Sequence, residues 1–382
     1  MAWLTGSKHA QARRLISQLS DPARRDNAAR ELVRIGSDAI PALIEGLQSP
    51  DPALQSTLHE ILKRMGPAAV PALAKTLQEA HPLHRATAAE ILGILGERAA
   101  VPILLDALRG QYYTVRAAAA SALGRIRDPR AKEPLVAALK DPEPPVRMTA
   151  VLALAAFRDP GTFPHMADLL LDDVQIEVRR AAARAFGATR DPASLRFLME
   201  ALHDSFWWYE RDAAMADLLA AIMAMGEASI DPLIASLSDP EGAVRRYAAT
   251  ALGALRGSRA VEPLGMALYD LHHEVGVAAA RALGRIGPES LEVLERASSH
   301  PEPGIRLNVA LALGGMDEPR AAALLLPLLQ DSDRGVQKQA ILSLSGQSDT
   351  QARLALQEIA ADRRDRELQS LARQALETSV AE

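Results

Sequence analysis

The feature that most constrains this chain is an internal repeat of about 31 residues. A segment that begins at Pro134 recurs in similar form at Pro232 and at Pro263. A landmark hydrophobic residue recurs with gaps of 31, 32, 66, 31, 30 and 31 residues, at Val115, Val146, Val178, Val244, Val275, Ile305 and Val336. The gap of 66 holds two units, one of them enlarged, and the ends are degenerate. We therefore predict about twelve stacked units, because self-similarity at this period is the signature of a solenoid.

Each unit carries two helical patterns and a stop signal. The first pattern follows a proline such as Pro102, which is tolerated in the first turn of a helix. The second places Val115, Ala119 and Leu123 on one stripe at helical spacing. A glycine or an Arg-Asp-Pro sequence then ends the unit, as at Gly36, Gly66, Gly96, Arg127 and Arg158. No segment alternates with period two, so we predict an all-α, right-handed α-solenoid with no sheet.

The landmark pattern resembles the HEAT repeat. In the unit at Pro134, Asp141 follows seven residues later, and Val146-Arg147 at twelve and thirteen. The short, alanine-rich form is similar to the phycobilin-lyase HEAT-like group, and the resemblance extends from about residue 8 to 378. It implies that the second helices line the concave face. It implies no single function, because such repeats serve many unrelated partners.

We expect one repeat solenoid over 1–382. Residues 1–36 form a basic N-terminal capping repeat, 37–346 the regular repeats with an enlarged repeat at 191–226, and 347–382 a C-terminal capping repeat. The charged ends are interpreted as solvated outer faces that keep the stack soluble.

Composition excludes several classes of function. The chain has no cysteine, so disulfides, thiolate metal sites and cysteine nucleophiles are absent. Its 43 Lys+Arg and 48 Asp+Glu give a net charge of −5, which disfavours a general nucleic-acid binder. No run of about 18 apolar residues occurs, so we expect no membrane insertion. The N-terminal sequence lacks the layout of a signal peptide, and a cytoplasmic protein is the expectation.

An acidic residue precedes an arginine in several units. The pairs are Asp141 and Arg147, Asp173 and Arg179, and Asp239 and Arg245, with Glu79 and Arg85 in the same register. The row could suggest catalytic carboxylates. We interpret it as a structural ladder that cross-links neighbouring turns through bidentate Arg–carboxylate contacts.

No motif predicts a conventional active site, cofactor or metal. His59-Glu60 and His273-Glu274 invite comparison with deoxyhypusine hydroxylase, a di-iron enzyme of HEAT-like repeats. The two pairs occupy different registers in their units, and a di-iron site needs about six convergent ligands. The chain also lacks a Gly-rich phosphate loop, a G-x-S-x-G elbow and an HExxH motif. We therefore predict no catalytic, cofactor-binding or metal-binding residue.

The enlarged repeat contains the run Phe206-Trp207-Trp208-Tyr209, and we expect its second helix to be about one turn longer. Groove-facing positions fall two, six and ten residues after the landmark valine. With the aromatics, they define a candidate partner-binding set: Arg180, Arg184, Trp207, Trp208, Tyr209, Arg246, Tyr247, Arg281 and Arg285. Trp, Tyr and Arg are typical of binding hot spots. The alternative is that the aromatics fill extra volume and the arginines pair with local acids such as Glu210 and Asp212.

Further groove positions are apolar: Met148, Leu152, Val277, Leu307, Leu311 and Leu342. Our first hypothesis is a non-enzymatic scaffold that holds a protein or peptide segment, possibly acidic, on its concave face. The resemblance supplies an alternative, a tetrapyrrole chaperone or lyase subunit whose arginines pair with propionates. Nucleic-acid binding, as in HEAT-like DNA glycosylases, and a di-iron hydroxylase are less favoured.

Overall fold

The computed structural model describes the backbone of residues 2–209, 212–362 and 364–378, and the side chains of 8–207, 214–362 and 364–377. These ranges contain α-helices and short 3-10 turns and no strand. The chain divides into two compact units, Met1–Phe197 and Leu198–Glu382, which are described separately below.

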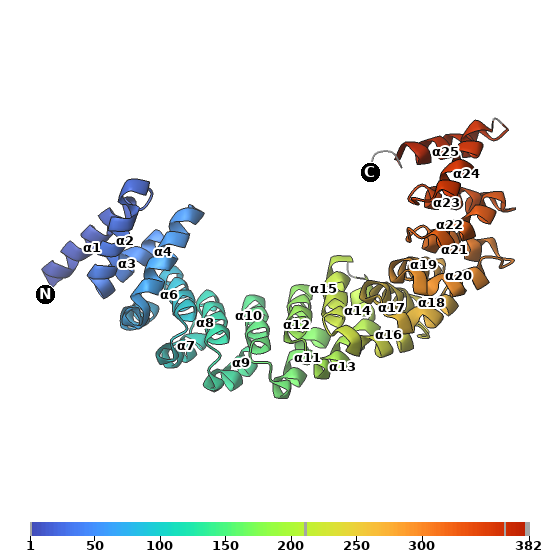
Figure 1. Cartoon of the computed structure of the whole chain (residues 1–382). Coiled ribbons are helices and arrows are strands. Elements are labelled where there is room, and N and C mark those ends of the chain that lie inside the picture. Colours follow the sequence, from blue (N-terminus) through green and yellow to red (C-terminus); the bar gives the residue numbers. More distant parts are fainter. Residues whose placement is uncertain (1, 210–211, 363, 379–382) are drawn as a thin grey trace. The chain divides into compact units, whose positions relative to one another are not determined.

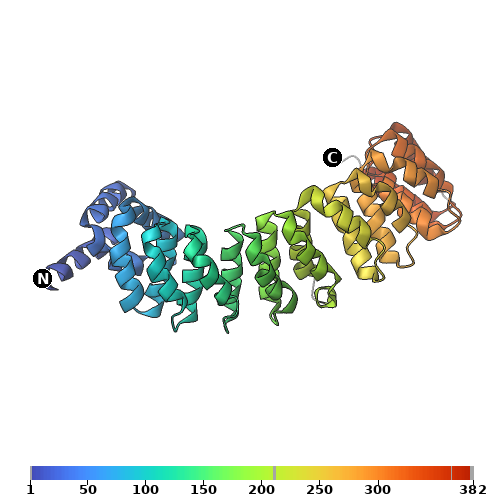
Figure 2. The same cartoon turned by 90° about the horizontal axis from the view of Figure 1, so that it is seen from below.

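Helices alternate between two layers in each unit (Figures 1 and 2). Unit 1 holds α1 (Ala2–Ser17), α2 (Pro22–Ile35), α3 (Ile40–Gly46), α4 (Pro52–Met65), α5 (Val70–Glu79), α6 (Pro82–Leu95), α7 (Val101–Leu108), α8 (Tyr113–Ile126), α9 (Lys132–Ala138), α10 (Pro144–Ala155), α11 (Phe163–Asp172) and α12 (Ile176–Thr189). The next helix, α13 (Leu195–His203), crosses the division between the units.

Unit 2 holds α14 (Ser205–Tyr209), α15 (Asp212–Met223), α16 (Ile230–Ser236), α17 (Gly242–Leu255), α18 (Val261–Ala267), α19 (His273–Ile286), α20 (Leu291–Ala297), α21 (Pro303–Leu313), α22 (Pro319–Leu325), α23 (Arg334–Leu344), α24 (Thr350–Ala361) and α25 (Arg366–Thr378). Within each unit the second helix of every repeat belongs to one layer, here called the inner layer, and the first helix to the other (Figure 1). The prediction of an all-α solenoid of about twelve two-helix repeats is confirmed.

Repeat ends lie where the stop signals predict them. Gly36, Gly66 and Gly96 have φ values of 69°, 55° and 72°. At Arg127, φ is 54°, and its N–H donates to the Leu123 carbonyl at 2.9 Å. The left-handed conformation ends the helix, and glycine adopts it without a Cβ penalty. The aspartate that follows Arg127, Asp128, then caps the next turn by accepting the Arg130 N–H at 3.0 Å.

Small residues let consecutive inner-layer helices touch backbone to backbone. A Cβ placed on Gly124 would lie 2.6 Å from Ala153 Cα, and one on Gly253 would lie 2.5 Å from Ala282 Cα. Leucine, valine and alanine side chains of both layers fill the space between them. The tight contact explains why glycine and alanine recur at fixed positions in the second helix of each repeat.

The enlarged repeat is described in two pieces. Helix α14 ends at Tyr209 and α15 begins at Asp212, on either side of residues 210 and 211, which lie outside the described residues. The longer second helix that we expected therefore stays a prediction.

Candidate functional site

Among the described residues, arginines of the inner layer bind carboxylates of the following repeat side-on. Arg147 Nε and Nη2 lie 2.7 and 2.9 Å from the Asp173 oxygens, and Arg245 makes the same contacts with Asp270 at 2.6 and 2.9 Å. Arg116 with Asp141 and Arg306 with Asp331 repeat the geometry.

Within one repeat, the arginine instead reaches the main chain of the aspartate that precedes it. Arg147 Nη1 donates to the Asp141 carbonyl at 2.9 Å, and Arg179 Nε to the Asp173 carbonyl at 2.7 Å. Arg245 does the same with Asp239 at 2.7 Å. The arginine therefore joins its own turn to the carboxylate of the next, which is a structural role.

Hydrogen bonds lower the pKa of three of these carboxylates, those of Asp141, Asp270 and Asp331. The hydrogen bond from Arg245 lowers the pKa of Asp270 against the opposing effect of burial, and Arg306 does the same to the pKa of Asp331. Burial is the largest influence on the pKa of Asp141 and raises it, but the bonds from Arg116 and the Glu143 N–H bring it below its ordinary value. Carboxylates held ionised in this way are not poised as general acids near neutral pH.

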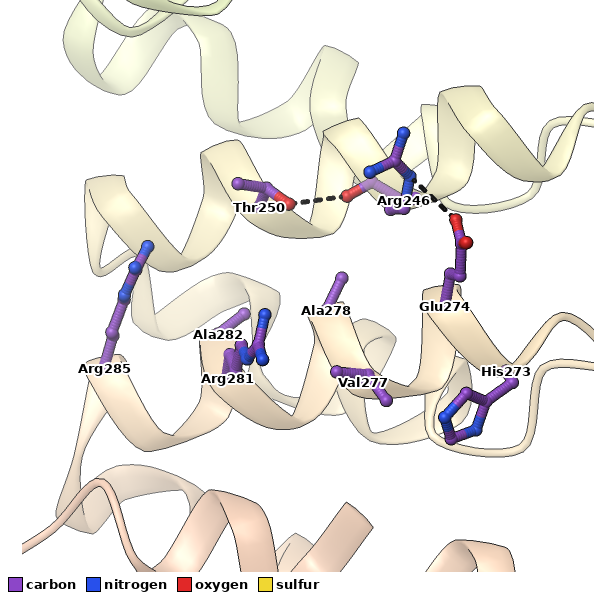
Figure 3. Close-up of a pocket in the computed structure, with 9 residues that line it drawn as sticks. All are labelled: Arg246, Thr250, His273, Glu274, Val277, Ala278, Arg281, Ala282 and Arg285. Carbon is purple, nitrogen blue, oxygen red and sulfur yellow. Dashed lines mark hydrogen bonds and ion pairs between the residues drawn. The ribbon is translucent and has the colours of Figure 1, made fainter. Parts of the chain in front are cut away.

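The candidate site is a groove in unit 2 that opens between α17 and α19 (Figure 3). Its volume is about 330 Å³. The lining residues come from the two helices: Arg246, Thr250, His273, Glu274, Val277, Ala278, Arg281, Ala282 and Arg285. Three of the predicted partner-binding residues, Arg246, Arg281 and Arg285, therefore lie together.

Arg246 differs from Arg281 and Arg285 in having a carboxylate close by. Arg246 lies 3.4 Å from the Glu274 carboxylate, and its guanidinium lies 4.3 Å from the ring centroid of Tyr247. Arg281 and Arg285 are exposed, and within the described residues no carboxylate lies within ion-pair distance of either side chain. Two cations one helical turn apart thus remain available to an anionic group.

The same two arginines border a second groove, of about 350 Å³, between α19, α21 and α23. Its other lining residues are mostly small or apolar: Gly284, Leu311, Gly314, Gly315, Gln339, Leu342 and Ser343. Leu342 is 49% exposed. We call the two together the inner groove, with Arg281 and Arg285 on the ridge between its basic and apolar halves.

The aromatic part of the predicted set is corrected by the structure. Trp207 is completely buried and Tyr247 is only 8% exposed. Neither ring is accessible to a partner, because both pack inside the repeat stack. The side chains of Trp208 and Tyr209, and also Glu210 and the side chain of Asp212, lie outside the described residues.

Arg180 and Arg184 lie on α12 of unit 1, and Arg246, Arg281 and Arg285 lie in unit 2. The predicted set of arginines therefore divides into one group in unit 1 and another in unit 2. The glycines that line the floor of the apolar half of the inner groove were not identified from the sequence. The doublet Gly314-Gly315 at the end of α21 could have indicated them.

The histidines do not assemble a metal centre. No group of three or more His, Asp or Glu side chains that could hold a metal ion occurs in the part of the chain that the structure describes. His59 lines a groove between α2 and α4 in unit 1, and His273 lies at the inner groove in unit 2. Over the described ranges, no single helix is long and apolar enough to span a bilayer. The one pair that passes jointly, Ala214–Met223 with Gly226–Ser236, is bent by 114°.

Comparison with protein families agrees with the repeat geometry. The family model for HEAT repeats matches residues 40–124, 104–177, 230–299 and 290–377. The chain belongs to the HEAT-repeat family. The model for the PBS lyase HEAT-like repeat matches residues 24–49 and 178–204. No match was found among curated proteins.

Solved structures of HEAT-like solenoids share the fold at low sequence identity. The karyopherin Kap121p, bound to the extreme C-terminus of the protein phosphatase Cdc14p, matches 97% of this chain with a TM-score of 0.58 and 15% identity, over 50% of its own length. Kap95p, in a complex with RanGDP, matches 97% with a TM-score of 0.56 and 11% identity, over 60% of its length. The chain thus spans about half to three fifths of these karyopherins, and the likeness shows the fold.

Proposed function

We propose that this protein is a non-enzymatic scaffold that binds an acidic segment of a protein partner in the inner groove of unit 2. The observation that carries the proposal is the pair Arg281 and Arg285. Both side chains are exposed on α19 beside a groove, and neither has a carboxylate partner among the described residues. Arginine binds carboxylates bidentately, so two such side chains favour an anionic ligand with fixed geometry.

Two further observations support a protein ligand. The apolar half of the inner groove holds Leu311 and the 49%-exposed Leu342, which gain from burial against another apolar surface. The solved structures of similar fold include Kap121p bound to a segment of Cdc14p. Extended solenoid surfaces are suited to holding such segments.

The test is an affinity capture from native lysate with three forms of the chain. The binding variant is Arg281→Glu/Arg285→Glu. The control, Arg109→Glu/Arg353→Glu, makes the same change in charge at exposed arginines outside the inner groove. We expect quantitative mass spectrometry to find a protein retained by the wild type and the control and lost from the binding variant. Equal retention by all three forms contradicts the proposal.

The tetrapyrrole alternative rests on the resemblance to the phycobilin-lyase HEAT-like repeats. An absorbance scan of the same eluates tests it, because a bound bilin is coloured. A coloured eluate that depends on Arg281 and Arg285 would replace the protein segment with a tetrapyrrole as the ligand.

A further inference from the structure

We infer that the occupant of the inner groove is an amphipathic α-helix with acidic side chains along one edge and large apolar side chains along the next. This inference rests on the proposed function and narrows it, since it names the conformation of the segment and the order of its contacts. It follows from the charged and apolar side chains that the inner groove presents and from the few hydrogen-bonding groups that it offers to an extended backbone.

The inner groove offers few partners to an extended backbone. The one side-chain amide among its lining residues belongs to Gln339, which donates to Ser343 Oγ at 3.2 Å. The hydroxyl of Thr250 donates to the Arg246 carbonyl at 2.9 Å, and Glu274 faces Arg246. Helical walls use their own N–H and C=O groups internally, so no sheet edge is available either. A helix satisfies its own backbone and presents only side chains, which is what this surface can contact.

The ridge of α19 provides the acidic contact. Arg281 and Arg285 are four residues apart, which places them about 6 Å apart along the helix axis. Like charges at this spacing repel each other in the free protein. Carboxylates spaced three or four residues apart on a partner helix match this interval and remove the repulsion.

The apolar half provides a trough beside that ridge. Gly284, Gly314 and Gly315 add no side chain to its floor, and Leu311 and Leu342 border it. The helices beneath are already in contact, since a Cβ on Gly284 would lie 2.7 Å from the Ala312 carbonyl oxygen. The trough is therefore a stable depression that admits a large apolar side chain from outside. A bound helix would therefore place its acidic side chains over α19 and its apolar side chains over α21 and α23.

A nucleic acid fits this arrangement less well. The sugar–phosphate backbone gains nothing from an apolar trough, and base stacking requires accessible aromatic rings. Apart from His273, the lining residues of the inner groove include no ring, and the net charge of the chain is −5.

The experiment is a selection from a displayed library of random 20-residue peptides on the full-length chain, with counter-selection on Arg281→Glu/Arg285→Glu. Peptides that survive are then tested against Leu342→Ser, with Leu354→Ser as its control. The two leucines are 49% and 48% exposed, and Leu354 lies on α24 outside the inner groove. Both substitutions are on the surface, so folding is preserved and is checked by circular dichroism.

We expect enriched peptides to carry acids three or four residues apart, with large apolar residues at helical spacing on the adjoining face. Binding should weaken at least tenfold with Leu342→Ser and stay unchanged with Leu354→Ser. A proline at the centre of the best peptide should weaken it at least tenfold, and a proline at its end should not.

The experiment distinguishes failure of the helix inference from failure of the proposed function. Acidic peptides without helical periodicity, or tolerance of the central proline, overturn the helix and leave the proposed function standing. An absence of peptides that depend on the two arginines overturns both. A fluorescent 20-nucleotide single strand is tested in parallel. Arginine-dependent binding of the strand in place of peptides makes the inner groove a nucleic-acid site and also overturns both.

Discussion

Arg245 and Asp270 join two consecutive repeats through a side-on pair of hydrogen bonds of 2.6 and 2.9 Å. The third guanidinium nitrogen of Arg245 donates to the carbonyls of Asp239 and Pro240, at 2.7 and 2.9 Å. The two side chains are only 12% and 11% exposed. One arginine therefore holds its own turn and the next repeat together, with most of the pair removed from water.

Removing this arginine should weaken the stack. We expect Arg245→Leu to lower the free energy of unfolding of unit 2 by about 3 kcal/mol, because it leaves the largely buried Asp270 without its partner. Chemical denaturation of the full chain measures the change. Arg296, which is 58% exposed and lies 2.7 Å from Glu262, is the control, since exposed pairs contribute little. A similar loss for Arg296→Leu would contradict this account.

Acid should also destabilise the protein through these carboxylates. The hydrogen bond from Arg245 lowers the pKa of Asp270 below 3.8, its value in an unfolded chain, and Arg306 does so for the pKa of Asp331. A depressed folded-state pKa contributes stability that is complete above pH 3.8 and is lost as pH falls through the folded value. Thermal unfolding between pH 5 and 2 should show this decline, and Asp270→Asn/Asp331→Asn should make it shallower. An equally steep decline in the variant would assign the effect to other carboxylates.

The side-on Arg–Asp contact is absent between the repeats of α19 and α21, and it should be restorable. Gly276 stands at the position of the arginine, and His300 at that of the aspartate in the next repeat. The side chain of Asn308 fills the space, since a Cβ on Gly276 would lie 2.6 Å from its Nδ2. Asn308 Oδ1 is buried without a hydrogen-bond partner among the described residues. We expect Gly276→Arg/His300→Asp/Asn308→Ala to raise the unfolding temperature.

Gly276→Arg alone should lower the unfolding temperature, because the new side chain then collides with Asn308 and has no carboxylate to bind. Differential scanning calorimetry compares the triple and single variants. A triple variant that unfolds at a lower temperature than the wild type would show that other contacts determine the stability of the interface between these repeats.

Two glycines should respond oppositely to the same substitution. A Cβ on Gly253 would lie 2.5 Å from the Ala282 backbone, whereas one on Gly304 meets nothing within 4 Å. Gly253→Ala should therefore destabilise the stack, because the two helices must separate. Gly304→Ala, in the first turn of α21, should stabilise it by up to about 1 kcal/mol through helix propensity. Denaturation midpoints measure both, and stabilisation by both would contradict the close approach.

Trp207 should behave as a core residue. It is completely buried, and its Nε1 has no hydrogen-bond partner among the described residues. Trp207→Ala should lower the free energy of unfolding by about 3–5 kcal/mol through the cavity it leaves. Trp207→Phe should cost less, because no hydrogen bond is lost. Calorimetry of the two variants checks the order, and weakened partner binding by a stably folded Trp207→Phe would return the ring to the binding surface.

The repeat period and the helix ends were readable from the sequence because they depend on local chemistry. The positions of the acids and arginines of the ladder were readable too, but not their pairing, since Arg147 binds the carboxylate of Asp173 in the next repeat and only the main chain of Asp141. A glycine or an arginine before Asp-Pro ends a helix wherever it occurs, as at Gly96 and Arg127. Groove-facing positions were also readable, since helical spacing alone places Arg281 and Arg285 on one face of α19.

Tertiary structure decided which of those residues are available. Spacing does not reveal that Arg246 faces Glu274, because the pairing joins different helices. Nor does it reveal that, among the described residues, no carboxylate lies within ion-pair distance of Arg281 or Arg285. It does not reveal that Trp207 is buried, since burial depends on how the repeats pack against one another. The sequence by itself determined the architecture and its inner face. Packing between repeats determined which side chains on that face remain free to bind.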